Sequence, residues 1–170
     1  MPLLEGGKEE AEAVGRWLAR MVPSPALVLT SPLARALETC RLAGFGNGAE
    51  ECADLMEWDY GDYEGRTTDD IRQERAGWTL WADGVPGGEA AADVGRRADR
   101  VIERVRSVEG DVVCFSHGHL LRVLAARWVG LPPVGGRLLA LDAGAVSTLG
   151  WERETPVVSL WNASAPAAAE

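Results

Sequence analysis

Residues 111–120 read DVVCFSHGHL, an apolar run that passes directly into a polar turn. Asp111 to Phe115 predict a buried strand, because short runs of this kind are typical of strands covered on both faces. A helix over residues 120–129 follows the turn. The stretch therefore predicts one strand-to-helix unit with two histidines at its turn.

A second unit of the same kind occurs earlier, at residues 26–43. We expect a strand over 26–29, with Ser31 as N-cap and Pro32 as the first residue of a helix to about residue 43. Two such units predict an α/β fold with a mostly parallel, doubly wound sheet and helices on both faces. Such sheets bind ligands beyond the carboxyl ends of their strands, where Arg35 and the two histidines would lie.

The rest of the chain predicts one domain over residues 1–162 and a flexible tail over 163–170. Apolar residues at helical spacing indicate helices over 7–21, 67–75 and 89–108. Residues 54–65 and 77–88 predict irregular loops. Residues 138–141, 145–151 and 157–161 predict antiparallel strands.

Charge and composition restrict the class of partner. The chain of 170 residues has 17 basic and 26 acidic residues, which argues against non-specific binding to nucleic acid or to an anionic membrane. No apolar run reaches the ~18 residues of a membrane span, and no secretion signal is evident, so we expect a cytoplasmic protein. The three cysteines predict reduced thiols.

The strongest candidates for chemistry are His117 and His119, the only two histidines of the chain. A helix N-terminus with free N–H groups is suited to phosphate, and Gly118 permits close approach of the backbone. Histidine is also the side chain best suited to reactions near neutral pH. The simpler alternative is a helix cap, and a metal site is disfavoured because no third ligand is near in the sequence.

Arg35 and Glu57 are further candidates that the residues alone leave open. Arg35 is either a phosphate clamp facing the crevice or a surface arginine paired to Glu38. Glu57 lies among aromatic side chains, where a carboxyl tends to keep its proton as a general acid does. The same stretch also reads as a solvated acidic loop.

Four ordered motifs resemble those of the histidine phosphatase superfamily, which includes the phosphoglycerate mutases. They are TSPLARALET at 30–39, LMEWDYGDYEG at 55–65, GGE at 87–89, and FSHGH at 115–119 with Arg122. The resemblance spans nearly the whole chain and is closest to small acid and sugar phosphatases. It implies a phosphoglycerate mutase-like fold.

The resemblance also implies a reaction, hydrolysis of a phosphorylated small molecule through a phosphohistidine, with no metal or other cofactor. Arg35 would bind the phosphoryl group, Glu57 would protonate the leaving alcohol, and His117 would stabilise charge on the phosphoryl oxygens. The substrate side would be lined by Tyr60, Gly118 and His119.

One departure from the family pattern concerns the nucleophile. Family members begin with an apolar strand that ends in Arg-His-Gly, and that histidine attacks phosphorus. Here residues 2–7 read PLLEGG, which resembles the stretch after that motif. We therefore expect the N-terminal strand to be absent from this chain, leaving a gap in the sheet. The exposed edges would make a homodimer possible.

Three alternatives to hydrolysis stay open at this level. The chain could bind a phosphorylated ligand or a partner protein without turnover. It could be a mutase, although the stretch after Tyr63 lacks the long basic insertion of mutases that hold a bisphosphate. His117 could also be the nucleophile itself, which is chemically allowed but contradicts the family assignment.

Overall fold

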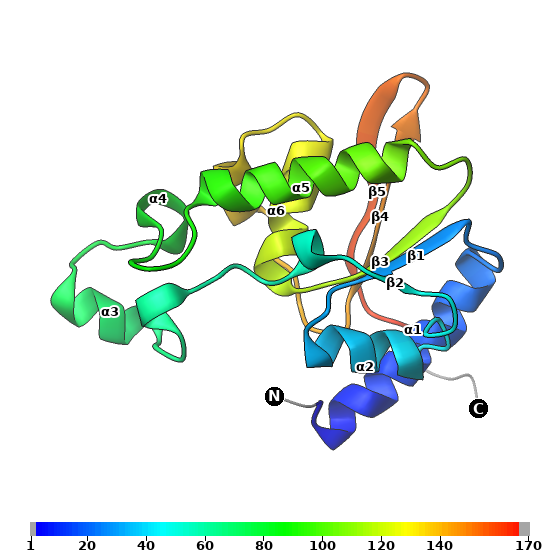
Figure 1. Ribbon diagram of the computed structural model, residues 1–170, viewed down its shortest axis with the longest axis horizontal. Coiled ribbons are helices and arrows are strands. Elements are labelled where there is room, and N and C mark those ends of the chain that lie inside the picture. The colour runs from blue at the N-terminus through cyan, green and yellow to red at the C-terminus, as the bar shows by residue number, and fades with distance from the viewer. Residues whose placement is uncertain (1–2, 167–170) are drawn as a thin grey trace.

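A computed structural model describes residues 3–166 and confirms the predicted α/β class (Figure 1). Its central sheet is parallel, with the order β2 (Glu50–Glu51), β1 (Leu27–Thr30), β3 (Val112–Phe115). Leu29 of β1 is in register with Cys114 of β3. Within residues 3–166, β3 pairs with no strand other than β1, so its second edge lies open.

Helices cover both faces of this sheet, as the two strand-to-helix units predicted. Figure 1 shows α5 (Ala91–Arg106) and α6 (Gly118–Trp128) on one side, and α1 (Glu5–Met21) and α2 (Ala34–Leu42) on the other. No helix in the described part of the chain is long and apolar enough to cross a membrane.

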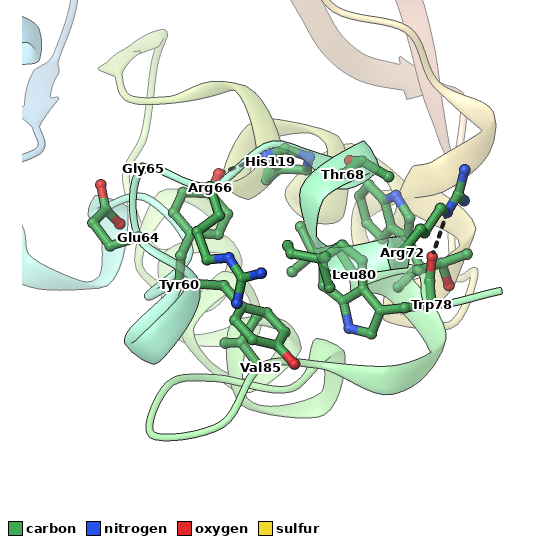
Figure 2. A pocket seen from close by; sticks show the side chains of 14 residues that line it. Tyr60, Glu64, Gly65, Arg66, Thr68, Arg72, Trp78, Leu80, Val85 and His119 are labelled. Atoms are coloured by element: carbon green, nitrogen blue, oxygen red, sulfur yellow. Dashed lines mark hydrogen bonds between the residues drawn. The ribbon is translucent and has the colours of Figure 1, made fainter. Parts of the chain in front are cut away.

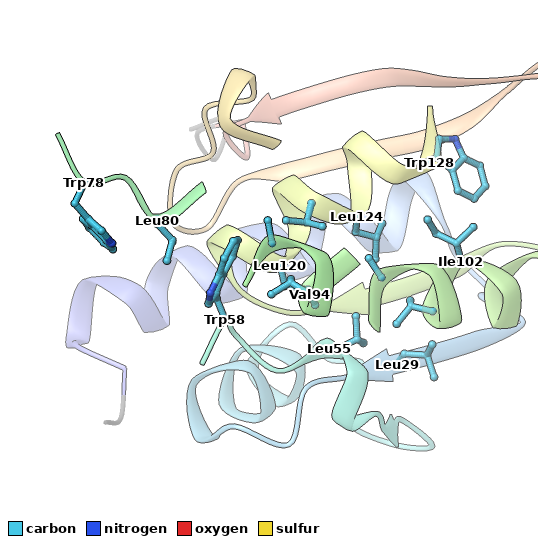
Figure 3. Packing of buried hydrophobic residues seen from close by; sticks show 14 of the residues in the cluster. Leu29, Leu55, Trp58, Trp78, Leu80, Val94, Ile102, Leu120, Leu124 and Trp128 are labelled. Carbon is cyan, nitrogen blue, oxygen red and sulfur yellow. The ribbon is translucent and has the colours of Figure 1, made fainter. Parts of the chain in front are cut away.

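The main core lies on the α5–α6 side, where the apolar stripe of α5 meets α6 and the sheet (Figure 3). Its fully buried side chains come from a strand, a loop and both helices: Leu29, Leu55, Trp58, Val94 and Leu120. Because Trp58 is part of this core, the loop that carries Glu57 is anchored to it directly. A smaller cluster around Cys40 and Phe115 fills the α1–α2 side.

Helices α1 and α2 approach so closely that one position of α1 admits no side chain. A Cβ atom added at Gly15 would lie 2.3 Å from the carbonyl oxygen and 2.5 Å from the Cα atom of Ala43. Such a distance to backbone atoms cannot be relieved by a rotamer change. Gly15 therefore determines how closely α1 approaches the carboxyl end of α2.

The segment between the sheet and α5 is more helical than the sequence predicted. The expected helix over 67–75 is confirmed as α3 (Thr68–Glu74), which begins with a capping box formed by Thr67 and Asp70. A short helix, α4 (Leu80–Asp83), lies inside the stretch 77–88 that we expected to be irregular. Its start is stabilised by Thr79, whose hydroxyl accepts a hydrogen bond from the amide of Ala82 at 3.2 Å.

The C-terminal part forms a separate antiparallel hairpin, β4 (Val146–Glu152) with β5 (Thr155–Ala163), as predicted for those residues. The expected strand over 138–141 is wrong. Residues 133–138 instead form a 3₁₀ helix that packs on α6: Arg122 donates to the carbonyl of Gly136 at 3.2 Å, and a Cβ atom at Gly136 would be 3.0 Å from the Arg122 carbonyl oxygen. The four residues at the end of the predicted tail, 167–170, lie outside the described part.

Candidate active site

The predicted strand-to-helix turn places His117 at the end of β3, as the N-cap residue of α6. Its side chain is buried, with 8% exposed, and Nε2 lies 2.8 Å from the hydroxyl oxygen of Ser31. Burial lowers the pKa of His117, and the charge of Arg35 lowers it further while that of Glu57 opposes the shift. The imidazole is therefore held uncharged near neutral pH.

Ser31 has a different role from the helix cap that we predicted. Helix α2 begins at Ala34 with Leu33 as its N-cap residue, so neither Ser31 nor Pro32 starts it. Ser31 is fully buried, and its hydroxyl accepts a hydrogen bond from the amide of Leu33 at 3.2 Å while bonding His117. The parallel pairing of β1 with β3 brings these two strand ends together, which the sequence alone could not show.

Glu57 occupies the N-terminus of α6, where backbone N–H groups and the helix dipole favour an anion. Its Oε1 accepts hydrogen bonds from the amides of Trp58 at 3.0 Å, His119 at 3.1 Å and Leu120 at 3.1 Å. We expected these helical N–H groups to bind phosphate directly, and this is wrong for those of residues 119 and 120. Since Oε2 has one weaker contact, 3.3 Å from the His119 amide, it is the freer oxygen.

Arg35 lies in the first turn of α2 and is exposed. Among residues 3–166 no ion pair engages its guanidinium, so the predicted alternative of pairing to Glu38 does not occur. Its charge contributes a lowering of the pKa of both His117 and Tyr60, so the guanidinium lies within electrostatic range of both side chains. The site thus has one uncommitted cation.

Tyr60 and His119 form a contacting pair beside Glu57. The Tyr60 hydroxyl lies 2.7 Å from Nδ1 of His119, and the two rings meet edge to face with centroids 5.8 Å apart. Burial lowers the pKa of His119 and raises that of the Tyr60 phenol, with Glu57 and Glu64 raising the latter further. Within residues 3–166 no three His, Cys, Asp or Glu side chains are grouped so as to hold a metal ion.

Gly118 lies in the same turn, but the close backbone approach that we predicted there does not occur in this structure, so position 118 does not require glycine. It is exposed, and an added Cβ atom would meet only Oε2 of Glu57, at an ordinary 3.9 Å. Close approach is instead required at Gly61 and Gly88, where added Cβ atoms would lie 2.3 Å from the carbonyl oxygens of Pro86 and Asp59. These two glycines let the loop after Glu57 pack against the GGE segment.

A partly buried ion pair holds the backbone of the Glu57 loop. Nε and Nη2 of Arg97 each donate to one Glu89 carboxylate oxygen at 2.7 Å, and only 12% and 20% of the two side chains are exposed. The same guanidinium also donates to the carbonyls of Asp54, Met56 and Glu57, at 2.9, 2.8 and 3.3 Å. Arg97 was not predicted from the sequence, where its only signal is its place eight residues after the glutamate of the GGE motif.

A pocket of about 460 Å³ adjoins His119, between the α3–α4 segment and the body of the protein (Figure 2). Tyr60 and His119 line it on the side of Glu57, and the remaining walls come from residues 63–85. Its volume is in the usual range for small-molecule sites. Its position beside the Glu57 turn makes it the space available to the organic part of a ligand.

Known proteins are similar to this chain in sequence and in fold. The histidine phosphatase superfamily (branch 1) matches residues 1–164. An acid phosphatase of Mycobacterium tuberculosis is 37% identical over 174 residues, covering 98% of this chain and 84% of the relative. A glucosyl-3-phosphoglycerate phosphatase of Mycolicibacterium vanbaalenii is 30% identical over 195 residues, covering 95% and 84%. A solved structure from M. tuberculosis, of an open reading frame, matches with a TM-score of 0.87 at 34% identity, covering 97% of this chain and 86% of that one. The chain therefore belongs to the histidine phosphatase superfamily and to the enzyme class of histidine-type phosphatases.

Proposed function

We propose that the protein hydrolyses phosphomonoesters of small metabolites through a phosphohistidine, at the site formed by Arg35, Glu57 and His117. The observation that carries the proposal is the arrangement at the carboxyl end of the sheet: the Glu57 carboxyl group bonds the first amides of α6, beside the buried His117 that caps this helix, and the exposed Arg35 lies within electrostatic range. The names of the relatives support this class, since an acid phosphatase and a glucosyl-3-phosphoglycerate phosphatase both release phosphate from an ester.

Each of the three side chains has a role that suits its surroundings. Arg35 binds the phosphoryl oxygens, because its guanidinium is exposed and uncommitted. His117 donates a hydrogen bond to the same oxygens and stabilises the charge that develops in transfer. Glu57 delivers a proton to the leaving alcohol through Oε2, its less engaged oxygen, as the ester bond breaks.

The second half of the reaction uses the same carboxylate. After the alcohol leaves, Oε2 of Glu57 accepts a proton from a water molecule, whose oxygen attacks the phosphohistidine. The phosphorus–nitrogen bond breaks as the phosphorus–oxygen bond forms. Inorganic phosphate and the free imidazole are the products, so the cycle balances without a metal.

The nucleophilic imidazole, in this proposal, comes from residues outside the 170-residue sequence. Both histidines of the chain already have structural partners, His117 with Ser31 and His119 with Tyr60. The second edge of β3, open within residues 3–166, offers a place for a further parallel strand whose end would lie beside His117.

The test compares the 170-residue chain with a version extended upstream by the in-frame residues, both assayed with p-nitrophenyl phosphate. In the extended chain we expect hydrolysis and a phosphohistidine that is labile in acid and stable in base. Glu57→Gln should greatly reduce the rate of hydrolysis of alkyl phosphates. Hydrolysis by the 170-residue chain that disappears in His117→Ala would instead make His117 the nucleophile. Phosphate binding without hydrolysis in the extended chain would favour the non-catalytic binder.

A further inference from the structure

Ser31 and His117 form a buried hydrogen bond whose direction decides what the imidazole presents to the site. The hydroxyl oxygen of Ser31 lies 2.8 Å from Nε2 of His117, and the serine is fully buried. An uncharged imidazole has one N–H group, on either Nδ1 or Nε2, and its other nitrogen can only accept. The two tautomers therefore make opposite demands on the serine hydroxyl.

The sheet fixes the position of Ser31 relative to the end of β3. Thr30 is in register with Phe115, and the amide of Ser31 donates to the carbonyl of Phe115 at 2.9 Å. The buried hydroxyl of Thr30 donates to the carbonyl of Ser31 at 3.2 Å. Because its N–H and its C=O are both bonded, the backbone of Ser31 holds the hydroxyl beside the His117 ring.

Only one direction of this bond satisfies every hydrogen-bonding group. The Ser31 hydroxyl accepts from the Leu33 amide at 3.2 Å, and among residues 3–166 its only other partner is His117. If the hydroxyl donates to Nε2, its hydrogen is paired. If Nε2–H donates instead, the oxygen accepts twice and the hydroxyl hydrogen, in a residue with 0% exposure, has no acceptor. An unpaired buried donor disfavours this second arrangement by about one to two orders of magnitude.

The other ring nitrogen of His117 reaches the surface of the site. In the described part of the chain Nδ1 has no hydrogen-bond partner, and no fully buried side-chain nitrogen or oxygen there lacks one. Nδ1 is therefore among the few atoms of this buried residue that remain accessible. In the satisfied arrangement Nδ1 is also the nitrogen that carries the proton.

A serine this close to a histidine is also the geometry of a nucleophile and its base. The full burial of Ser31 excludes that role in this structure, because no phosphorus atom can approach a hydroxyl with 0% exposure. Ser31 can act on the reaction only through the imidazole that it bonds.

We propose that Ser31 is a positioning residue that holds His117 in the tautomer with the proton on Nδ1, so that the imidazole presents its single N–H group to the phosphoryl oxygens. The position of those oxygens rests on the proposed function, whereas the tautomer does not. With the proton on Nε2, the ring would turn a lone pair toward the anion and could not stabilise its charge.

Nitrogen NMR of the 170-residue chain, free of added histidines, tests the tautomer without requiring turnover. The chemical shifts of the two nitrogens of a neutral imidazole report which one is protonated, and His119→Gln distinguishes the two histidines. At about pH 8 we expect a protonated Nδ1 and an unprotonated Nε2 in His117. This measurement needs no change at position 31. In Ser31→Ala neither tautomer has a partner at Nε2, so the two shifts should converge.

Ser116→Ala is the matched control, because it also removes a serine hydroxyl beside His117. That hydroxyl donates to the Leu55 carbonyl at 2.7 Å and not to the ring, so the nitrogen shifts of His117 should not change. Inorganic phosphate probes the site, and we expect it to shift Nδ1 in the unmodified chain. Ser31→Ala should weaken phosphate binding about two- to fivefold, because only part of the population then carries the proton on Nδ1.

Two results would overturn the inference. One is a protonated Nε2 with an unprotonated Nδ1 in the unmodified chain, and the other is a folded Ser31→Ala variant whose His117 shifts are unchanged. Failure of the proposed function looks different. In that case phosphate shifts neither nitrogen of His117, while the tautomer and its dependence on Ser31 remain.

Discussion

Replacing Arg97 with methionine should destabilise the protein severely, although Arg97 lies outside the group of reacting side chains. The change leaves the Glu89 carboxylate, 20% exposed, without its bidentate partner, and it removes donors from three carbonyls of residues 54–57. Removing one partner of a fully buried pair costs about 3–5 kcal/mol, and for this partly buried pair we expect the lower end, about 3 kcal/mol. With a urea m-value of about 2–3 kcal/mol per molar, the unfolding midpoint should fall by about 1–1.5 M.

Two further variants make the Arg97 prediction specific. Arg100→Met is the matched control, because Arg100 lies one turn later on α5 and pairs with Asp54 at the surface, so its midpoint should barely move. Adding Glu89→Gln to Arg97→Met removes the stranded charge, so the double variant should be no less stable than Arg97→Met alone. Equal midpoints for Arg97→Met and Arg100→Met would refute the reasoning that burial makes the difference.

Two other perturbations have outcomes that follow from contacts or burial. Gly15→Ala should cost about 1–3 kcal/mol by calorimetric melting, because its Cβ would overlap the backbone of Ala43, whereas Gly6→Ala in open space on the same helix should be neutral or slightly stabilising. Burial lowers the pKa of His117 and His119 below 6.5, so the unfolded chain binds more protons just below that pH. Between about pH 5 and 8 the contribution of these two histidines to stability should therefore decline as the pH falls through 6.5, and His119→Gln should flatten this decline when the unfolding free energy is measured in urea at each pH. An unchanged slope in that variant would mean that His119 does not contribute.

The sequence predicted the strands and helices well wherever a buried face imposes a regular pattern. The runs at 26–29 and 111–115 are apolar because each strand is covered on both sides, and the long helices carry one apolar stripe each. It failed at 138–141, where the path of the backbone depends on contact with α6 and not on local alternation.

The proposed site was predictable as a set of residues but not as an arrangement. Motif resemblance singled out Arg35, Glu57 and His117, and the roles given to them stay predictions. The hydrogen bonds from the α6 N–H groups to Glu57 could not be predicted, because donor and acceptor are separated by 62 positions in one bond and by 63 in the other. The same holds for Arg97, which reaches the Glu57 loop across 40 or more residues.

The sequence by itself determined the fold class, the family and the identity of the side chains available for chemistry, because these depend on local periodicity and on short motifs. The tertiary structure alone decided which donors meet which acceptors. The parallel pairing of β1 with β3 brings Ser31 to His117, and the packing of the α3–α4 segment beside His119 encloses the pocket there. Hydrogen bonds act only over about 3 Å, so their partners are selected by the packing of distant segments, which no local pattern in the chain records.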